Sequence, residues 1–398
     1  MKIAYLNTYS NGSTGRIIGG LKEICRDNDI EAISIYSRGP QLNDETSYRH
    51  HCKVEFYLDA LCTRFLDAHG LGNIFNTISI IRRLKRFNPD IIHLHNLHGY
   101  WINYPLLFRF IKKHNIKVVW TFHDCWHFTG HCTHFDYVKC DKWKKGCNHC
   151  IQTREFPSSY LDFSTRNYSL KKSSFTSVKD MIIVTPSAWL KEKVNQSFLK
   201  DYRIEVIHNG IDLSVFNPSS NTEIKEEILK QGYHAIVLGV AATWTERKGL
   251  EVIQEVARRR DDWFFVAIGS ATEEQRVKLK NMMYIDRTEN VNELKDWYSA
   301  ADLLAQPTLE DTYPTTNLEA IACGTPVVTF ATGGSEEIVI ESGCGLVTKD
   351  RTAKSLEATI DNIVNNKALV KKQSALELDS NKNFRKYIVL YNWLYKGY

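Results

Sequence analysis

The sequence predicts an α/β protein with two domains, each built on a doubly wound parallel β-sheet. A length of 398 residues is typical of two domains, and a hydrophobic content of 43% is sufficient for two cores. Short apolar segments alternate along the chain with segments of helical periodicity, which is the pattern of strand-helix-strand units. Ligands of such sheets lie at the carboxyl ends of the strands, so the polar segments that follow strands are the candidates for function.

The first domain is expected over residues 1–216. Its strands are expected at residues 2–6, 32–36, 91–94, 118–122, 181–184 and 204–207, and its helices at residues 16–27, 78–87, 105–114 and 187–199. The loop at residues 7–15 follows the first strand, and its Gly12 and Gly15 allow the backbone to approach a phosphate. The glycine fingerprint of dinucleotide-binding proteins is absent from this loop, which argues against a nicotinamide dehydrogenase.

Histidines follow two of these strands. His123 directly follows the strand expected at 118–122, and Asn96 and His98 follow the strand at 91–94. A histidine at the exit of a buried parallel strand is placed to reach the ligand crevice. We therefore expect His123 to contact a ligand, with helix capping as the structural alternative, and Asn96 and His98 to line the path of a second substrate.

A cysteine-rich segment follows His123, within an insertion expected at about residues 125–155. Half of the ten cysteines lie between residues 125 and 150, and the C-x2-C spacing of the last two is typical of metal knuckles. Surrounding lysines would favour the negative charge of a tetrathiolate centre. The sequence predicts a structural zinc site, with free or redox-active thiols as the alternative; its expected ligands are Cys132, Cys140, Cys147 and Cys150.

The second domain is expected over residues 217–378, with strands at residues 235–240, 263–268, 303–305, 327–330 and 346–347. Arg247 and Lys248 lie in the loop after its first strand, just before a helix expected at 250–259. Basic residues at a helix N-terminus oppose the helix dipole, and a bound anion would reverse that cost.

Residues 307–328 are the most informative part of this domain. The segment predicts the end of a strand, a loop, a helix and a turn into another buried strand, with Asp311 in the loop and Glu319 in the helix. A loop that leads into a helix N-terminus presents free N–H groups to an anion or a polyol. The pattern favours a nucleotide-sugar site, and the alternative is a capped helix with solvated acids.

The tail of the chain has a helical pattern from residue 353 to residue 398, and its aromatic end, expected as a separate helix at 379–398, requires a partner surface. A helix that lies on a membrane is one alternative for this end.

Three motifs resemble those of the retaining glycosyltransferases of family 4. Asp311 and Glu319 have the spacing of the family's two acids and are followed by Cys-Gly-Thr-Pro-Val-Val at 323–328. The segment His-Asn-Gly-Ile-Asp at 208–212 and the Lys-Gly pair at 248–249 are also similar to family segments. The first acid is Asp rather than Glu, Pro314 replaces a common Gly, and Arg247 is the obvious substitute for an arginine that the family has earlier in its loop.

The resemblance implies the GT-B fold, in which two Rossmann-like domains face a central cleft and the last helix crosses back to the first domain. The implied activity is hexosyl transfer from a nucleoside-diphosphate sugar to an acceptor hydroxyl with retention of configuration. The catalytic residues would be His123, Arg247, Lys248 and Asp311. The donor-binding residues would be Gly12, Gly15, Thr312, Tyr313, Pro314, Thr315, Thr316, Asn317 and Glu319.

The same resemblance implies that no catalytic metal is needed, so that any zinc would be structural. Asn96 and His98 would lie on the acceptor side, and the acceptor would be a glycan, expected to be lipid-linked, in polysaccharide or lipopolysaccharide assembly. Two alternatives remain: a nucleotide-sugar epimerase of the same fold, which would change its sugar without an acceptor, and a non-catalytic relative that binds without turnover.

Charge and hydropathy suggest where the protein acts. The net charge is +5, but residues 1–200 carry 28 Lys and Arg against 17 Asp and Glu, whereas the remainder has a balance of −6. No run of eighteen apolar residues and no signal-peptide pattern is present, so we expect a cytoplasmic protein. The basic first half, with Arg82, Arg83, Lys85 and Arg86, suggests peripheral contact with the inner face of the cytoplasmic membrane, and nucleic acid is not expected as a partner.

Overall fold

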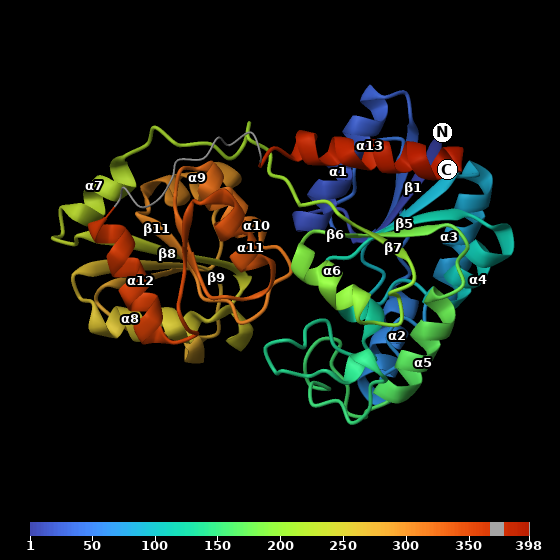
Figure 1. Cartoon of the computed structure of the whole chain (residues 1–398), viewed down its shortest axis with the longest axis horizontal. Helices are drawn as coiled ribbons and strands as arrows, with labels where there is room; N and C mark the ends of the chain where they lie inside the picture. Colours follow the sequence, from blue (N-terminus) through green and yellow to red (C-terminus); the bar gives the residue numbers. More distant parts are fainter. Residues whose placement is uncertain (367–377, 398) are drawn as a thin grey trace. The chain divides into compact units, whose positions relative to one another are not determined.

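The computed structural model describes residues 1–366 and 378–397, which form two compact units (Figure 1). The first unit contains Met1–His208 and Asn383–Tyr398, and the second contains Asn209–Lys382. The helical pattern expected for the tail includes residues 367–377 and 398, which lie outside the described residues.

The first unit is built on a seven-stranded sheet in the order β3-β2-β1-β4-β5-β6-β7, in which every neighbouring pair is parallel. The strands are β1 (Lys2–Tyr9), β2 (Glu31–Arg38), β3 (Ser47–Arg49), β4 (Ile91–Leu94), β5 (Lys117–Thr121), β6 (Met181–Thr185) and β7 (Arg203–Val206). The helices are α1 (Gly12–Asp27), α2 (Lys53–Leu66), α3 (Ile74–Phe87), α4 (Tyr104–His114), α5 (Ser164–Phe175), α6 (Ala188–Asn195) and most of α13 (Ser380–Lys396).

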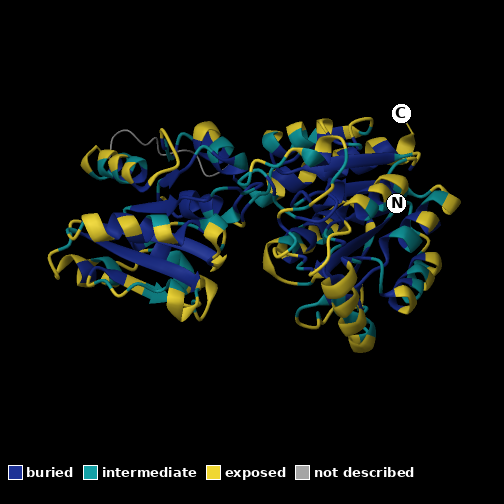
Figure 2. Cartoon of the chain, turned by 90° about the horizontal axis from the view of Figure 1, so that it is seen from below, coloured by how far each residue is buried: buried dark blue, intermediate teal, exposed yellow. Residues whose placement is uncertain are grey.

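Alternating strand residues divide the core of this unit between the two faces of the sheet. Leu6 and Ile92 face a core that contains the apolar sides of α3 and α4, whereas Tyr5 and Ile91 face α1 and α13. Both faces are buried because helices cover both, which is why the strands are apolar runs rather than alternating sequences. Figure 2 shows the same arrangement, with buried strands inside and exposed residues on the outer sides of the helices.

Helix α13 supplies the aromatic end of the chain to this core. Phe384, Tyr387 and Tyr391 are buried with the apolar side of α1, and Gly20 of α1 leaves the space that the Phe384 ring occupies. The Tyr391 hydroxyl lies 2.6 Å from Nδ1 of His93 and 3.2 Å from the hydroxyl of Tyr5. These three aromatic residues of α13 are therefore part of the core of the first unit, whereas Trp393 and Tyr395 are exposed.

The second unit is built on a six-stranded parallel sheet in the order β10-β9-β8-β11-β12-β13. Its strands are β8 (Ala235–Thr243), β9 (Trp263–Ser270), β10 (Met282–Ile285), β11 (Leu303–Gln306), β12 (Val327–Thr329) and β13 (Gly345–Val347). Its helices are α7 (Glu223–Leu229), α8 (Leu250–Arg259), α9 (Val291–Ala300), α10 (Thr315–Ala322), α11 (Gly333–Ser342) and α12 (Ala353–Asn365).

The predicted α/β class with two parallel sheets is confirmed. The prediction missed β3, β10 and several helices, α2 and α5 among them. The division between the units also falls earlier than the expected residue 217, because Ile211 and Phe216 are buried in the core of the second unit. Among the helices formed by the described residues, none is both long and apolar enough to span a bilayer.

Candidate functional site

Each sheet has a topological switch point, where the chain continues on the opposite side of the first strand. In the first unit it lies between β1 and β4, and in the second between β8 and β11. Loops that leave neighbouring strands at such a point separate and expose a crevice at the carboxyl edge of the sheet, which is where ligands of doubly wound sheets bind. Most of the predicted site residues follow these strands.

At the switch point of the second unit, the loop after β8 meets the loop after β11. Nζ of Lys248 lies 2.6 Å from Oδ2 of Asp311, and Nη1 of Arg247 lies 3.9 Å from the same oxygen. The Arg247 guanidinium also donates to the carbonyl of Glu310. The structure thus brings together three of the four predicted catalytic residues: the cations Arg247 and Lys248 and the acid Asp311. The acid forms an ion pair with Lys248.

Two glycines allow the loops to lie this close. Gly249 has a φ of 76°, and a Cβ at this position would lie 2.3 Å from the carbonyl oxygen of Pro307. Gly333, at the start of α11, has a φ of 52°, and its Cβ would lie 2.0 Å from the carbonyl oxygen of Asp311. Neither position accepts a side chain without moving the loop that carries Asp311. The loop is thus held from both sides by backbone contacts.

Helix α10 begins at Thr315, directly after this loop. Pro314 occupies the N-cap position and provides no side-chain acceptor, while its carbonyl accepts from the N–H of Asn317 at 3.2 Å. The N–H groups of Thr315 and Thr316 precede the first intrahelical bond and are available to a ligand. In the described part of the chain, three buried side-chain oxygens around this helix have no hydrogen-bond partner: Oγ1 of Thr316, Oδ1 of Asn317 and Oε1 of Gln306. Unsatisfied buried polar atoms are uncommon in folded proteins, and a bound ligand or ordered water is one explanation for them.

Glu319 lies one turn into α10 and is buried. Its Oε2 accepts a hydrogen bond of 2.9 Å from the hydroxyl of Tyr298, a fully buried residue of α9. A buried carboxylate is stable only where donors compensate for the lost hydration. Tyr298 therefore holds Glu319 in position.

This contact gives a first prediction. Replacing Tyr298 with phenylalanine is expected to lower the free energy of unfolding by about 1.5–3 kcal/mol, because a hydrogen bond to a charged group is lost inside the protein. Denaturant unfolding measures the effect. Tyr57→Phe is the matched control, since Tyr57 is 64% exposed, and it should change stability by less than about 0.5 kcal/mol. Equal stability of the two variants would contradict the importance of this contact.

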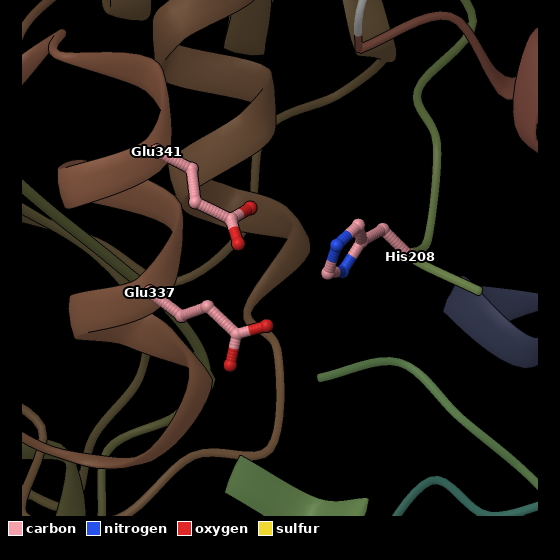
Figure 3. A group of neighbouring side chains, drawn as sticks. All are labelled: His208, Glu337 and Glu341. Atoms are coloured by element: carbon pink, nitrogen blue, oxygen red, sulfur yellow. The ribbon is translucent and has the colours of Figure 1, made fainter. Parts of the chain in front are cut away.

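Tyr313, predicted to bind the donor, belongs to the core of the second unit instead of lying open at the surface. Burial raises the pKa of its hydroxyl, and the carboxylates of Glu341 and Glu337 raise it further. These two glutamates lie one turn apart on α11, and their side chains extend from the same side of that helix (Figure 3). Figure 3 also labels His208, which follows β7 and whose Nδ1 lies 2.8 Å from the carbonyl oxygen of Pro186.

At the switch point of the first unit, the loop after β1 meets the loop after β4. Gly12 is the first residue of α1 and has a φ of 70°, and a Cβ on Gly15 would lie 2.5 Å from the carbonyl carbon of Ser10. The side chain of Asn7 joins the two loops, because its Oδ1 accepts from the backbone N–H of Asn96 at 3.2 Å. The predicted Gly12, Gly15 and Asn96 thus lie at one edge of the sheet.

His123 follows β5, the strand next to β4, and lies at the same edge of the sheet. Its Nε2 is 3.0 Å from Nδ1 of His95, and the two rings are stacked with centroids 5.3 Å apart. Burial lowers the pKa of His123 to about 4, so the imidazole is neutral at physiological pH. Nε2 of His98 lies 2.7 Å from Oδ2 of Asp124, and His98 holds the pKa of this buried carboxyl well below its usual range. The edge therefore presents a neutral imidazole beside a paired histidine and aspartate.

The cysteine-rich segment does not have the predicted arrangement. Cys132 is buried and the other three expected ligands are half-buried, but within residues 1–366 and 378–397 no three of these thiols lie within 4.8 Å of one another. The Cys132 thiol instead donates to Cys150, which lowers the pKa of Cys150 to about 7, and the Cys147 sulfur accepts from the N–H of Gly130 at 3.1 Å. Cys147 also interacts electrostatically with Cys140 and Cys150, so these thiols lie in one region, but not with the spacing of a closed tetrathiolate centre. The zinc prediction is therefore not supported.

Sequence reasoning missed several residues of these two edges. His95 was not selected although it directly follows β4, and Gln306, the last residue of β11, was not selected although it directly precedes residues 307–328. Tyr298 comes from a helix that the prediction did not include. A polar residue at a strand end was a usable signal for the first two, whereas the position of Tyr298 depends on tertiary packing.

Comparison with known proteins identifies the class of protein that has these two sheets and these candidate sites. The model of glycosyl transferases group 1 matches residues 191–382, and the model of glycosyltransferase family 4 matches residues 32–215. The chain belongs to family 4 of the glycosyltransferases, and its fold is GT-B, as the sequence predicted.

Individual relatives agree with this assignment. WcaC of Escherichia coli (strain K12), named for glycosyl transfer in colanic acid biosynthesis, is 23% identical over 310 residues, which cover 74% of this chain and 72% of the relative. Sucrose-phosphate synthase from Thermosynechococcus elongatus has a similar structure with a TM-score of 0.73 at 14% identity, and covers 100% of both chains. The Anabaena protein HepE, solved in complex with UDP and glucose, has a TM-score of 0.67 at 13% identity and covers 98% of both chains.

Proposed function

We propose that this glycosyltransferase moves a hexose from a nucleoside-diphosphate sugar to a hydroxyl group of a glycan acceptor with retention of configuration. The observation that carries the proposal is the group formed by Lys248, Arg247 and Asp311 at the switch point of the second unit. Asp311 is the partner of Lys248 at 2.6 Å. A diphosphate would take over Lys248, and Asp311 would then be available to sugar hydroxyls.

The chemistry assigned to each group follows from charge. The departing diphosphate gains negative charge as the glycosidic bond breaks, and fixed cations and helix N–H groups stabilise that charge. Lys248 and Arg247 supply the cations, and the backbone N–H groups of Thr315 and Thr316 at the start of α10 supply donors. We assign Glu319 to the ribose hydroxyls. HepE, which shares the fold, binds UDP and glucose, in agreement with a nucleotide-sugar donor.

We assign the first unit to the acceptor and to the sugar of the donor. His123 is proposed to contact the donor sugar as a neutral imidazole, and Gly12 and Gly15 to lie near the diphosphate. Asn96 and His98 are proposed to line the path of the acceptor. We infer that the acceptor is lipid-linked and that the protein acts in the cytoplasm at the inner face of the membrane, because the first half of the chain has an excess of positive charge.

A panel of UDP-, GDP- and ADP-sugars tests the donor assignment. A ligand present at 100 times its dissociation constant stabilises the protein by about 2.7 kcal/mol, which raises the melting temperature measurably. We expect one nucleotide class to shift the melting temperature and to release nucleotide only when an acceptor is added. The absence of a shift with every member of the panel would contradict a nucleotide-sugar donor. Conversion of the sugar without an acceptor would favour an epimerase.

A further inference from the structure

Helix α2 has the opposite amphipathic pattern to that of an ordinary surface helix. Its polar residues Asp59 and Thr63 are almost completely buried, as is Asp67, which follows its last turn. Its large apolar residues point outward at the spacing of one helical face. These exposed residues are Val54, Tyr57, Leu58, Leu61 and Phe65.

The inner side of α2 is polar because it anchors neighbouring segments. Oδ2 of Asp59 accepts from Nδ2 of Asn73 at 2.6 Å. The carboxylate of Glu55 accepts from the first N–H groups of α3, at 2.9 Å from Phe75 and 2.7 Å from Asn76. These bonds fix the rotation of the helix, so the apolar side cannot turn inward. The outward position of the apolar side is therefore fixed by the hydrogen bonds of the first unit.

The apolar surface continues beyond the helix. Phe75, at the start of α3, is 77% exposed, and Tyr160 is 66% exposed. The N–H of Tyr160 donates to the carbonyl of Arg64 at 2.7 Å, and the ring of Tyr160 lies 5.5 Å from that of Phe65. We call the exposed residues Val54, Tyr57, Leu58, Leu61, Phe65, Phe75 and Tyr160 the α2 face (helix α2 is labelled in Figure 1).

The charges on this surface select one kind of occupant. Within α2, every residue of which is described, the exposed charged residues are Lys53 and Arg64, both cations, whereas its acids are buried or half-buried. Arg64 also stacks on the ring of Tyr160. The apolar side of α2 thus has cations at its rim and no exposed anion within the helix, although Asp162 is exposed near Tyr160. This part of the surface is complementary to an anionic lipid surface, in which a helix lies parallel to the plane with its apolar side among the acyl chains.

The basic run of α3 is a different case. Ile80 and Leu84, on the apolar side of that helix, are buried in the core. Arg82, Lys85 and Arg86 are exposed, so this basic part of α3 offers charge without exposed apolar side chains beside it. Charge alone gives binding that salt screens, whereas inserted apolar side chains give binding that salt leaves largely intact.

We propose that the α2 face inserts into the surface of an anionic lipid bilayer and is the membrane-binding site of this protein. The proposal rests on the membrane part of the proposed function and specifies its surface. Aromatic contacts link this face to the acceptor side: the ring of Phe56 lies 5.7 Å from that of Tyr100, and His69 lies between Tyr100 and His98 with ring distances of 4.8 and 6.4 Å. Insertion would thus place a lipid-linked acceptor near His98.

Vesicle sedimentation of the full chain tests the proposal. Vesicles of phosphatidylcholine alone and of phosphatidylcholine with phosphatidylglycerol are compared at low and high salt. We expect binding to the anionic vesicles that persists in part at high salt. Leu61→Asp should lower this binding at least tenfold at either salt concentration. Val389→Asp, at a site on α13 that is 71% exposed, is the matched control and should bind as the unmodified protein does.

Two further measurements separate this proposal from the others. Charge reversal at Arg82 and Arg86 should remove only the part of the binding that salt also removes. The shift in melting temperature caused by nucleotide should be the same for Leu61→Asp and for the unmodified protein. If Leu61→Asp loses vesicle binding and keeps this shift, the substitution has affected the α2 face and not the donor site. Unchanged vesicle binding by Leu61→Asp would overturn the proposal. A dimer of the unmodified protein that Leu61→Asp converts to a monomer, with no binding to vesicles, would assign the face to a second copy instead.

Discussion

Lys248→Ala is expected to lower the rate of sugar transfer about 10- to 150-fold, with a smaller effect on the stability of the fold. A hydrogen bond between charged groups contributes roughly 1.5–3 kcal/mol, and each 1.36 kcal/mol of lost transition-state stabilisation costs about a factor of ten in rate. The loss of stability should be the smaller effect, because Arg247 stays 3.9 Å from Asp311 and keeps a positive charge beside the carboxylate. The initial rate of nucleotide release with the donor identified in the panel measures the effect.

A second lysine provides the control. Nζ of Lys225 lies 2.8 Å from Oδ1 of Asp302, which precedes β11 and therefore lies at the opposite edge of the same sheet. Lys225→Ala removes an equivalent ion pair that no donor would contact, and transfer should stay near normal. Equal rates for the two variants would contradict the role assigned to Lys248.

Tyr391→Ala is expected to lower the free energy of unfolding by about 3–5 kcal/mol, the range found when a buried aromatic side chain is removed. Tyr391 is fully buried, and its hydroxyl contacts both His93 and Tyr5. The substitution leaves a cavity and takes a hydrogen-bond partner from a buried histidine. Denaturant unfolding, followed by a probe within the first unit, measures the change.

The neighbouring residue Val389 is the control, because it lies on the same helix and is 71% exposed. Val389→Ala should stay within about 0.5 kcal/mol of the unmodified protein. Similar small effects of both substitutions would mean that α13 contributes little to the core of the first unit. The activity of Tyr391→Ala should fall in parallel with its folded fraction rather than independently of it.

Much of the fold could be predicted because its signals are local. Runs such as 91–94 and 235–240 are apolar on both faces, as strands of a parallel sheet covered by helices must be, and both lie in strands of the structure. The alternation with helices predicted that the strands are parallel, whereas the order in which they pair is known from the structure alone. The loops with Lys248 and Asp311 could be selected for the same reason, since each directly follows a strand.

The remaining features depend on contacts between distant segments. The bond between Lys248 and Asp311 joins residues 63 positions apart, and no local pattern indicates it. The four cysteines have the spacing of metal ligands, but spacing does not fix the directions of the thiols. Helix α2 was missed although its apolar residues have helical spacing. Its orientation could not be predicted, because the periodicity of a helix is the same whichever side faces the solvent.

The position of α13 also sets an order of events during synthesis. The ribosome completes β1 to β7 early, but Phe384, Tyr387 and Tyr391 are among the last residues made, after the whole of Asn209–Lys382. At bacterial elongation rates this interval is on the order of ten seconds or more. During that time the apolar side of α1, with Ile17 and Leu21, has no α13 to cover it. The nascent first unit therefore exposes this apolar surface until translation ends, and its final packing step is post-translational.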